Sequence, residues 1–193
     1  MYLKIFWKKI VPILPFIFVI AFTILAYNYV DTQRLLNWIG LENAYLMMYL
    51  ISFAGGLTTF NFIPYYSVII LLVSAGLPPI YVGIASALGI MSGDTFSYFM
   101  GYSGSKVIPE KYKLIFERIA EWAKRKPKLF IFGSFLYGTF CPLPNDFITV
   151  PSGIAKIPYR KIMIPLMLGN LIFNIGVAYI SLYGDQYLKL IFG

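Results

Sequence analysis

Residues 129–153 read LFIFGSFLYGTFCPLPNDFITVPSG, and this stretch decides the fold. It is apolar over most of its length, but Pro142 and Pro144 interrupt its middle, and Gly153 ends it. A helix that crosses a bilayer needs about 20 consecutive apolar residues, and both arms beside the interruption are shorter than that. The pattern therefore predicts a helical hairpin that enters the membrane and returns to the same side. Irregular backbone at that depth must be buried in protein or line a wet cavity.

A second stretch of the same kind covers residues 44–76, where Asn61 and Pro64 mark the break. Each broken stretch is followed by an unbroken apolar segment, over residues 80–102 in the first half and 162–183 in the second. These two segments are long enough to cross a bilayer as helices. Each half therefore predicts a hairpin followed by one spanning helix.

The two halves also share short motifs, since Ser74-Ala75-Gly76 in the first is similar to Ser152-Gly153 in the second. We expect an all-α integral membrane protein with two inverted repeats and an additional N-terminal transmembrane helix. Paired broken segments in corresponding positions are typical of transport sites. The predicted parts of this single membrane domain, residues 1–193, are an N-terminal helix with an outer loop (1–43), the first repeat (44–102), a basic loop (103–128) and the second repeat (129–184).

The composition supports a membrane location and excludes several kinds of chemistry. The chain is 59% hydrophobic and 12% charged, whereas a soluble domain has about 25% charged residues. It contains no His and a single Cys, which excludes an internal disulfide and removes the usual general base. We expect neither a metal site nor a cofactor, and we expect no catalytic residue.

The positions of the basic residues predict the topology. Lysines precede the apolar segment 10–30, and further basic residues lie within 103–128 and 156–161. Basic clusters stay on the cytoplasmic side of a membrane. With all three clusters inside, the N-terminus is cytoplasmic and the C-terminus is outside, in a multi-pass protein of the plasma membrane. The net charge of +8 then favours anionic lipid over nucleic acid as a partner.

Within the basic loop, apolar residues recur at helical spacing at Tyr112, Ile115, Ile119 and Trp122. This pattern predicts an amphipathic helix, which either lies on the membrane surface or packs on the rest of the protein. The basic residues that we expect to contact lipid head groups are Lys124, Arg125, Lys126 and Arg160.

Asp94 and Asp146 are the only acids within the apolar stretches. A carboxylate at bilayer depth costs about 2.5–3.5 kcal/mol on insertion scales, so both are candidates for a substrate or proton pathway. The alternative for each is a structural role in helix packing or capping. Asn61 and Asn145 are candidates for the same pathway. For Asn170 and Asn174 we favour hydrogen bonding between helices, which such side chains commonly provide in membranes.

The order of these motifs resembles the DedA family, also called VTT-domain proteins, over residues 44–184. The resemblance rests on Ser74-Ala75-Gly76, then Gly93-Asp94, and then the run from Pro142 to Asp146 that leads to Ser152-Gly153. It implies two opposed re-entrant hairpins packed against spanning helices. It also implies movement of lipids or phosphorylated polyprenyl carriers across the bilayer, with use of the proton motive force in bacteria.

The chain departs from the family pattern at the residues that carry charge. Many bacterial members have acids in the first hairpin where this chain has Ala54 and Tyr66, and arginines in the second hairpin where it has Thr139 and Asn145. Fork-like recognition of phosphate by arginine therefore does not carry over. A divergent branch of the family has Pro and Asp at the positions of Pro142 and Asp146, and this chain resembles that branch.

The leading functional hypothesis is a transporter that flips or scrambles a lipid or a lipid-linked phosphate, with membrane lipids, anionic or polyprenyl-phosphate, as partners. A small-solute exporter is the closest alternative, and it predicts a closed polar cavity in place of a groove open to the bilayer. An intramembrane aspartyl protease is a third class, but Met91-Ser92-Gly93-Asp94 lacks the first Gly of the protease motif. A structural assembly factor is the fourth.

Overall fold

The computed structural model describes residues 32–57, 65–104, 108 and 110–192. The N-terminal helix expected over residues 10–30 lies outside the described residues, as do Asn61 and Pro64. The described residues form α-helices and no strand. The helices are α3 (Thr32–Ile39), α4 (Leu41–Leu57), α5 (Tyr65–Ser74), α6 (Pro79–Ser103), α7 (Glu110–Arg125), α8 (Pro127–Phe140), α9 (Asp146–Ile154) and α10 (Tyr159–Phe192).

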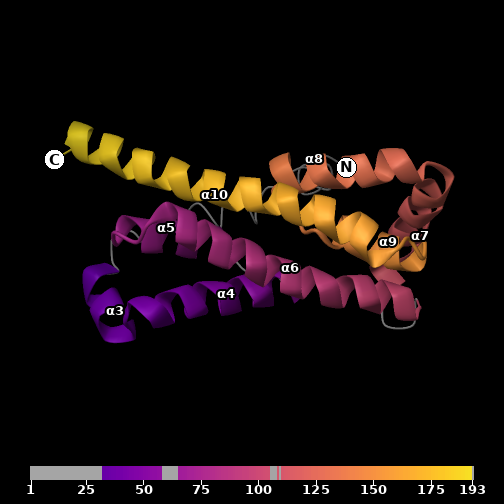
Figure 1. The fold of residues 1–193 in the computed structure, drawn as a ribbon, viewed down its shortest axis with the longest axis horizontal. Helices are drawn as coiled ribbons and strands as arrows, with labels where there is room; N and C mark the ends of the chain where they lie inside the picture. The colour runs from indigo at the N-terminus through magenta and orange to yellow at the C-terminus, as the bar shows by residue number, and fades with distance from the viewer. Residues whose placement is uncertain (1–31, 58–64, 105–107, 109, 193) are drawn as a thin grey trace, which may run out of the picture.

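Both broken stretches are folded as a longer helix followed by a short one. α4 and α5 have 17 and 10 residues, and α8 and α9 have 14 and 9. Pro142 and Pro144 lie in the turn between α8 and α9, where proline removes a backbone donor and stops the helix. Figure 1 shows α3 and α5 at one end of the molecule and α7 and α9 at the other. The long helices α6 and α10 run between these two ends.

The long helices make the central contact and each packs against both hairpins. α6 packs on α4 and on α9, while α10 packs on α8 and on α5. Gly89 of α6 contacts the backbone of α4 at Tyr49, and Gly169 of α10 contacts the backbone of α8 at Phe135. At both positions a Cβ atom would overlap a carbonyl oxygen, so only glycine permits these approaches.

The short helices α5 and α9 end in the same way. The amides of Gly76 and Leu77 donate to Val73 O and Leu72 O at 2.9 and 3.1 Å, which is a Schellman motif. The amides of Lys156 and Ile157 donate to Gly153 O and Ser152 O at 3.0 and 3.1 Å in the same pattern.

Gly76 has φ +98° and Lys156 has φ +58°, which is the left-handed region that favours glycine. The structure therefore pairs Gly76 with Lys156, whereas the sequence comparison pairs it with Gly153. Gly153 lies inside α9, where it packs against the backbone of Tyr98 in α6.

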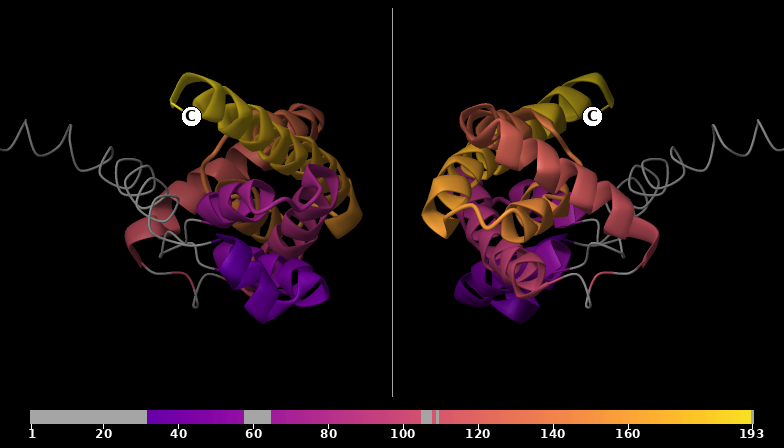
Figure 2. Two further views of the ribbon diagram at one scale, coloured as in Figure 1. Left: turned by 90° about the vertical axis from the view of Figure 1, so that its left-hand side faces the viewer. Right: turned by 90° about the vertical axis from the view of Figure 1, so that its right-hand side faces the viewer.

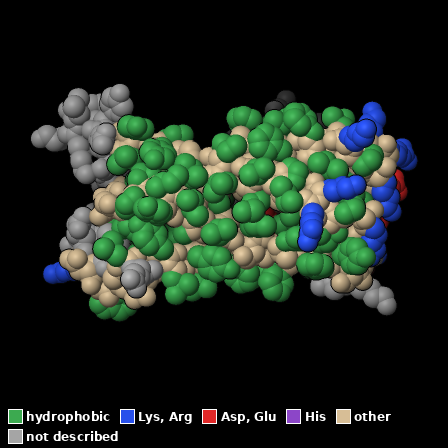
Figure 3. Space-filling view, in the orientation of Figure 1, with side chains coloured by type: hydrophobic (Ala, Val, Ile, Leu, Met, Phe, Trp, Pro, Cys, Tyr) green, Lys and Arg blue, Asp and Glu red, His purple; other side chains and the backbone are tan. Residues whose placement is uncertain are grey.

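The outer surface is apolar over the middle of the molecule. Large hydrophobic side chains are exposed on the helices that surround the core, among them Leu50, Phe96, Phe132 and Ile172, and Figure 3 shows such side chains across the face in view. Within the described residues one helical segment, Tyr159–Gly184 of α10, is long and apolar enough to cross a membrane. α6 has 25 residues and carries several Gly and Ser residues that it buries against its neighbours.

α7 lies across one end of the bundle. The views along the longest axis in Figure 2 show α7 lengthwise. It packs on α9 through Phe116, Ala120 and Ala123, which are 0–2% exposed. The predicted apolar stripe is thus only partly buried, because Ile115 and Trp122 are 45% and 43% exposed.

Basic side chains gather at the end where α7 lies (Figure 3). Lys124, Arg125 and Lys126 at the end of α7 are exposed, and so is Arg160 at the start of α10. Two basic segments that are distant in the sequence thus lie at the same end of the molecule.

Candidate functional site

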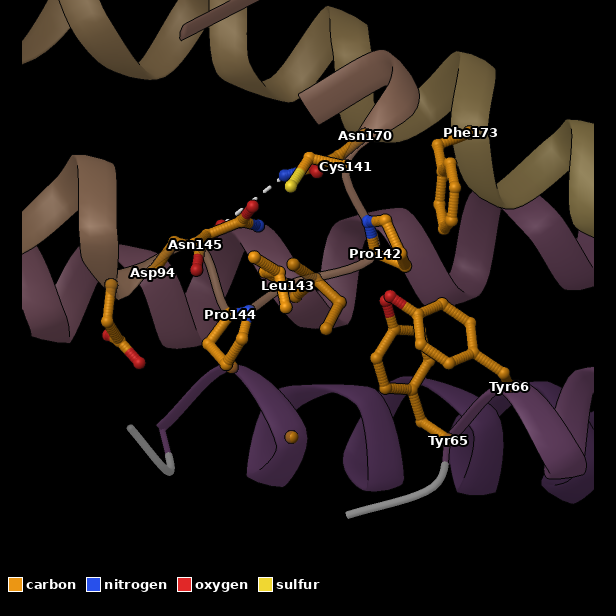
Figure 4. Close-up of a pocket in the computed structure, with 14 residues that line it drawn as sticks. Tyr65, Tyr66, Asp94, Cys141, Pro142, Leu143, Pro144, Asn145, Asn170 and Phe173 are labelled. Carbon is orange, nitrogen blue, oxygen red and sulfur yellow. Dashed lines mark hydrogen bonds between the residues drawn. The ribbon is translucent and has the colours of Figure 1, made fainter. Parts of the chain in front are cut away.

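A pocket lined by both polar and apolar side chains lies in the middle of the bundle, where the two hairpins and the two long helices meet. Its cavity volume is about 50 Å³, and part of it opens to the protein surface. The described residues that line it are Gly55, Gly56, Tyr65, Tyr66, Ile90, Asp94, Cys141, Pro142, Leu143, Pro144, Asn145, Asp146, Asn170 and Phe173. Figure 4 shows them from one side. Residues that flank the first break and the turn of the second hairpin therefore share one cavity.

Asp94 of α6 is hydrogen-bonded to two other residues of this pocket. Its side chain is 1% exposed. The side-chain amide of Asn145 donates to Asp94 Oδ2 at 2.8 Å, and that of Asn170 donates to the same oxygen at 3.4 Å. A buried carboxyl needs such donors, because an unsatisfied one loses its hydration without compensation. Asp94 thus joins α6, the turn of the second hairpin and α10.

Asp146 is the first residue of α9 and lines the same pocket as Asp94. It is 2% exposed, and the two carboxyl groups interact electrostatically. An acid in the first turn of a helix is stabilised by the helix dipole. The fold therefore brings together two acids that are far apart in the sequence.

The turn that carries Asn145 is held in place by α8. The hydroxyl of Tyr137 donates to Pro144 O at 2.9 Å. The hydroxyl of Thr149 and the amide of Ile148 both donate to Asn145 O, at 3.2 and 2.8 Å. The Tyr137 bond satisfies the carbonyl group of Pro144 in the turn, whereas the bonds to Asn145 O belong to the first turn of α9. The position of Asn145 against Asp94 is thereby fixed.

Aromatic rings form a further part of the wall. Tyr65 and Tyr66 come from the start of α5, and Phe173 comes from α10. The Tyr66 and Phe173 rings meet edge to face with centroids 5.7 Å apart. Figure 4 shows the three rings on the side of Pro142. We predict no role for these three rings from the sequence, among the 17 Phe and 16 Tyr of the chain, although Tyr65-Tyr66 follows Pro64 and Tyr66 stands where many bacterial members of the DedA family have an acid.

A chain of buried hydrogen bonds leads from the pocket into the core. Asn170, which bonds to Asp94, accepts a bond at its backbone oxygen from the side chain of Asn174 at 2.8 Å. Ser86 donates to Asn174 Oδ1 at 2.8 Å, and Ser86 and Ser52 lie 3.0 Å apart at their hydroxyl oxygens. Asn174 thus has the interhelical role that we favour from the sequence, whereas Asn170 also lines the pocket.

The predicted site residues fall into two groups in the structure. Asp94, Asp146, Asn145, Pro142 and Pro144 meet at the pocket. The predicted lipid contacts Lys124, Arg125, Lys126 and Arg160 lie at the basic end, and none of them lines it. Among the described residues no group of three or more acids and cysteines is placed to hold a metal ion.

An apolar outer surface, a pocket lined by both polar and apolar side chains in the middle of the bundle and basic residues at one end are the features of a helical membrane protein. Residues 63–183 match the family model of the VTT domain. The chain therefore belongs to the VTT-domain family of the DedA, or SNARE-associated, type. Proteins of this family are membrane-associated and are generally not enzymes. No curated protein and no solved structure matches the chain.

Proposed function

We propose that this protein is a transporter, and not an enzyme, that moves a lipid across the bilayer. The observation that carries the proposal is the pocket, which places two buried acids where the hairpins meet, in a bundle whose outer surface is apolar. Buried acids in membrane segments are costly and typically mark substrate or proton pathways. The sequence resemblance to a family of lipid movers points the same way.

The proposed architecture is an inverted repeat of two re-entrant hairpins. In its support, α4, α5 and α6 correspond in order to α8, α9 and α10. A two-fold relation between the halves requires equivalent contacts in both. Such contacts are made by Gly89 and Gly169, and the ends of α5 and α9 also match. α5 and α9 are also too short to cross a bilayer, at about 1.5 Å per residue. Such repeats allow a site near the midplane to open to either side.

The proposed location is the plasma membrane, with the basic end, and hence the N-terminus, on the cytoplasmic side and the C-terminus outside. The gathering of exposed basic residues at the end where α7 lies supports this orientation. At that end α7 exposes Leu114, Ile115 and Trp122 beside Arg118 and Arg125. This mixture suits the boundary between head groups and acyl chains, so we place α7 against anionic lipid.

The proposed coupling uses the two acids. Asp94 and Asp146 line the same pocket, and a proton bound by one of two carboxyl groups that share a site alters proton binding by the other. As the pocket becomes wet on alternate sides, such a pair can take up and release a proton.

The test is transport by the purified protein in vesicles, measured for several lipid head groups with and without a pH gradient. We expect gradient-driven transport that Asp146→Asn reduces toward the rate of protein-free vesicles, while expression and thermal stability stay near wild type. The exposed acid Glu110 on α7 provides the control, because Glu110→Gln removes a charge far from the pocket. Normal gradient-driven transport by Asp146→Asn would rule out coupling through this residue, and no transport of any lipid by the wild type would rule out the function.

A further inference from the structure

The charge of the pocket differs from that of the rest of the protein. The chain has a net charge of +8, yet the described residues that line the pocket include two Asp and neither Lys nor Arg. Residues 58–64, which link α4 and α5 in the sequence, read TTFNFIP and contain no charged residue. The pocket is thus the acidic part of a basic protein.

A phosphate group does not suit these walls. Phosphate is bound in proteins by positive charge and by several converging N–H donors, most often from Arg. The side-chain amides of Asn145 and Asn170 are directed at Asp94. Two acids in a site with little water repel an anion more strongly than they would in solution.

A positively charged amine suits the same walls. Carboxyl groups accept hydrogen bonds from an ammonium group, and the faces of aromatic rings attract it. The pocket has carboxyl groups and aromatic side chains, because Asp94 and Asp146 share it with Tyr65, Tyr66 and Phe173. The prolines of the turn add apolar surface that would pack against methylene or methyl groups next to the nitrogen.

We propose that the pocket binds a positively charged amine or quaternary ammonium group, and that this group belongs to the head group of the transported lipid. The assignment of the ligand as a transported lipid rests on the proposed function. The assignment of a positively charged nitrogen group rests on the residues of the pocket alone. It selects lipids whose head group carries a positively charged amine over lipids whose head group carries negative charge alone, and it places the phosphate of an amine-bearing phospholipid outside the pocket.

The test is lipid binding to the full-length purified protein, measured by native mass spectrometry in detergent with matched acyl chains. The probes are phosphatidylethanolamine, phosphatidylcholine, phosphatidylglycerol and a polyprenyl phosphate. We expect the part of the binding that Asp94→Asn removes to favour the two amine lipids about tenfold over the two anionic lipids, which equals about 1.4 kcal/mol. Equal or tighter binding of phosphatidylglycerol or the polyprenyl phosphate at the pocket would overturn the inference.

Variants connect that preference to the pocket. Asp94→Asn and Asp146→Asn should each lower the preference, and Glu110→Gln should leave it unchanged. Phe173→Leu keeps the charge and removes a ring, so it should weaken amine-lipid binding roughly threefold or more. This variant provides the test if an Asp variant does not fold. A preference that survives both Asp94→Asn and Phe173→Leu in folded protein would show that the pocket is not its source.

Two further measurements distinguish a failure of this inference from a failure of the proposed function. Free ethanolamine and tetramethylammonium test the source of the amine, since binding of either as tightly as the lipid would overturn the lipid assignment and keep the ammonium one. Transport in vesicles is scored separately. Transport of phosphatidylglycerol as fast as phosphatidylethanolamine would support the proposed function but contradict the preference for an ammonium group. Selective binding of amine lipids without any transport would support the ammonium preference but contradict the proposed function.

Discussion

At the scale of single residues, Gly101 and Gly153 bring α6 and α9 into backbone contact. A Cβ atom on Gly153 would overlap the carbonyl oxygen of Tyr98, and one on Gly101 would overlap that of Val150. The same contact includes the hydroxyl of Tyr98, which donates to Ile157 O at 2.6 Å beyond the end of α9. The position of Asp146, at the other end of α9, depends on this fit.

We therefore expect Gly153→Ala to destabilise the protein by about 1–3 kcal/mol, the usual cost of overpacking a core. Thermal unfolding in detergent measures the change. Gly176→Ala is the matched control, because a Cβ atom on Gly176 of α10 would meet nothing within 4 Å. Equal melting temperatures for the two variants would contradict the tight contact between α6 and α9.

Lys156 is unusual at the same scale, because it occupies a left-handed position where the first half has Gly76. Its ammonium group lies 3.5 Å from the centroid of the Tyr102 ring and donates to the backbone oxygen of Tyr102. Such a cation–π contact is worth about 0.5–1 kcal/mol at an exposed site. The contact offsets part of the backbone strain and ties the start of α10 to the end of α6.

At the scale of helices, α7 has two different faces. Phe116, Ala120 and Ala123 face the protein, while Leu114 and Trp122 are 69% and 43% exposed. The pairing of basic and apolar groups on the outer face is what an interfacial helix requires.

We expect replacement of Lys124, Arg125 and Lys126 by Gln to reduce the amount of anionic lipid that co-purifies with the protein. Each basic residue near an anionic surface contributes about 1 kcal/mol, and salt should weaken the wild-type effect because it screens the charges. Quantitative lipid mass spectrometry at two salt concentrations measures both. Arg34→Gln at the opposite end is the control, and an equal loss of lipid from it would refute a specific role for α7.

Helices were easier to predict from the sequence than their contacts. α6 and the turn at Pro142 and Pro144 follow directly from long apolar runs and proline chemistry, which are local. The buried face of α7 was harder, because its small residues Ala120 and Ala123 carry little hydropathy and yet pack closest. The pocket wall of Tyr65, Tyr66 and Phe173 depends on contacts between distant segments, which no local pattern encodes.

At the scale of the whole molecule, the two hairpins meet at the pocket. Tyr66 follows the first break and Cys141 begins the turn of the second hairpin, and both line the same cavity. The chain has no other cysteine, so a single introduced cysteine forms a defined pair.

We expect Tyr66→Cys to be cross-linked to Cys141 by a short bifunctional maleimide in intact membranes. The product migrates faster in a denaturing gel because the loop between the two residues is closed. Tyr66→Cys combined with Cys141→Ser should show no such product. If a folded Tyr66→Cys protein consistently fails to cross-link, the contact between the hairpins is wrong.

The short helix of each half packs on the long helix of the other half, since α5 contacts α10 and α9 contacts α6. This arrangement affects the order in which contacts can form during synthesis. Figure 1 shows α10 as the last part of the chain, yet α5 packs against it, and Tyr66 and Ala178 contribute to that contact. A ribosome has completed the first hairpin long before α10 emerges, so the inner side of α5 faces lipid or the insertion machinery during synthesis. The first half therefore acquires this partner only after the second hairpin has been made, and a chain truncated before α10 lacks the helix on which α5 packs.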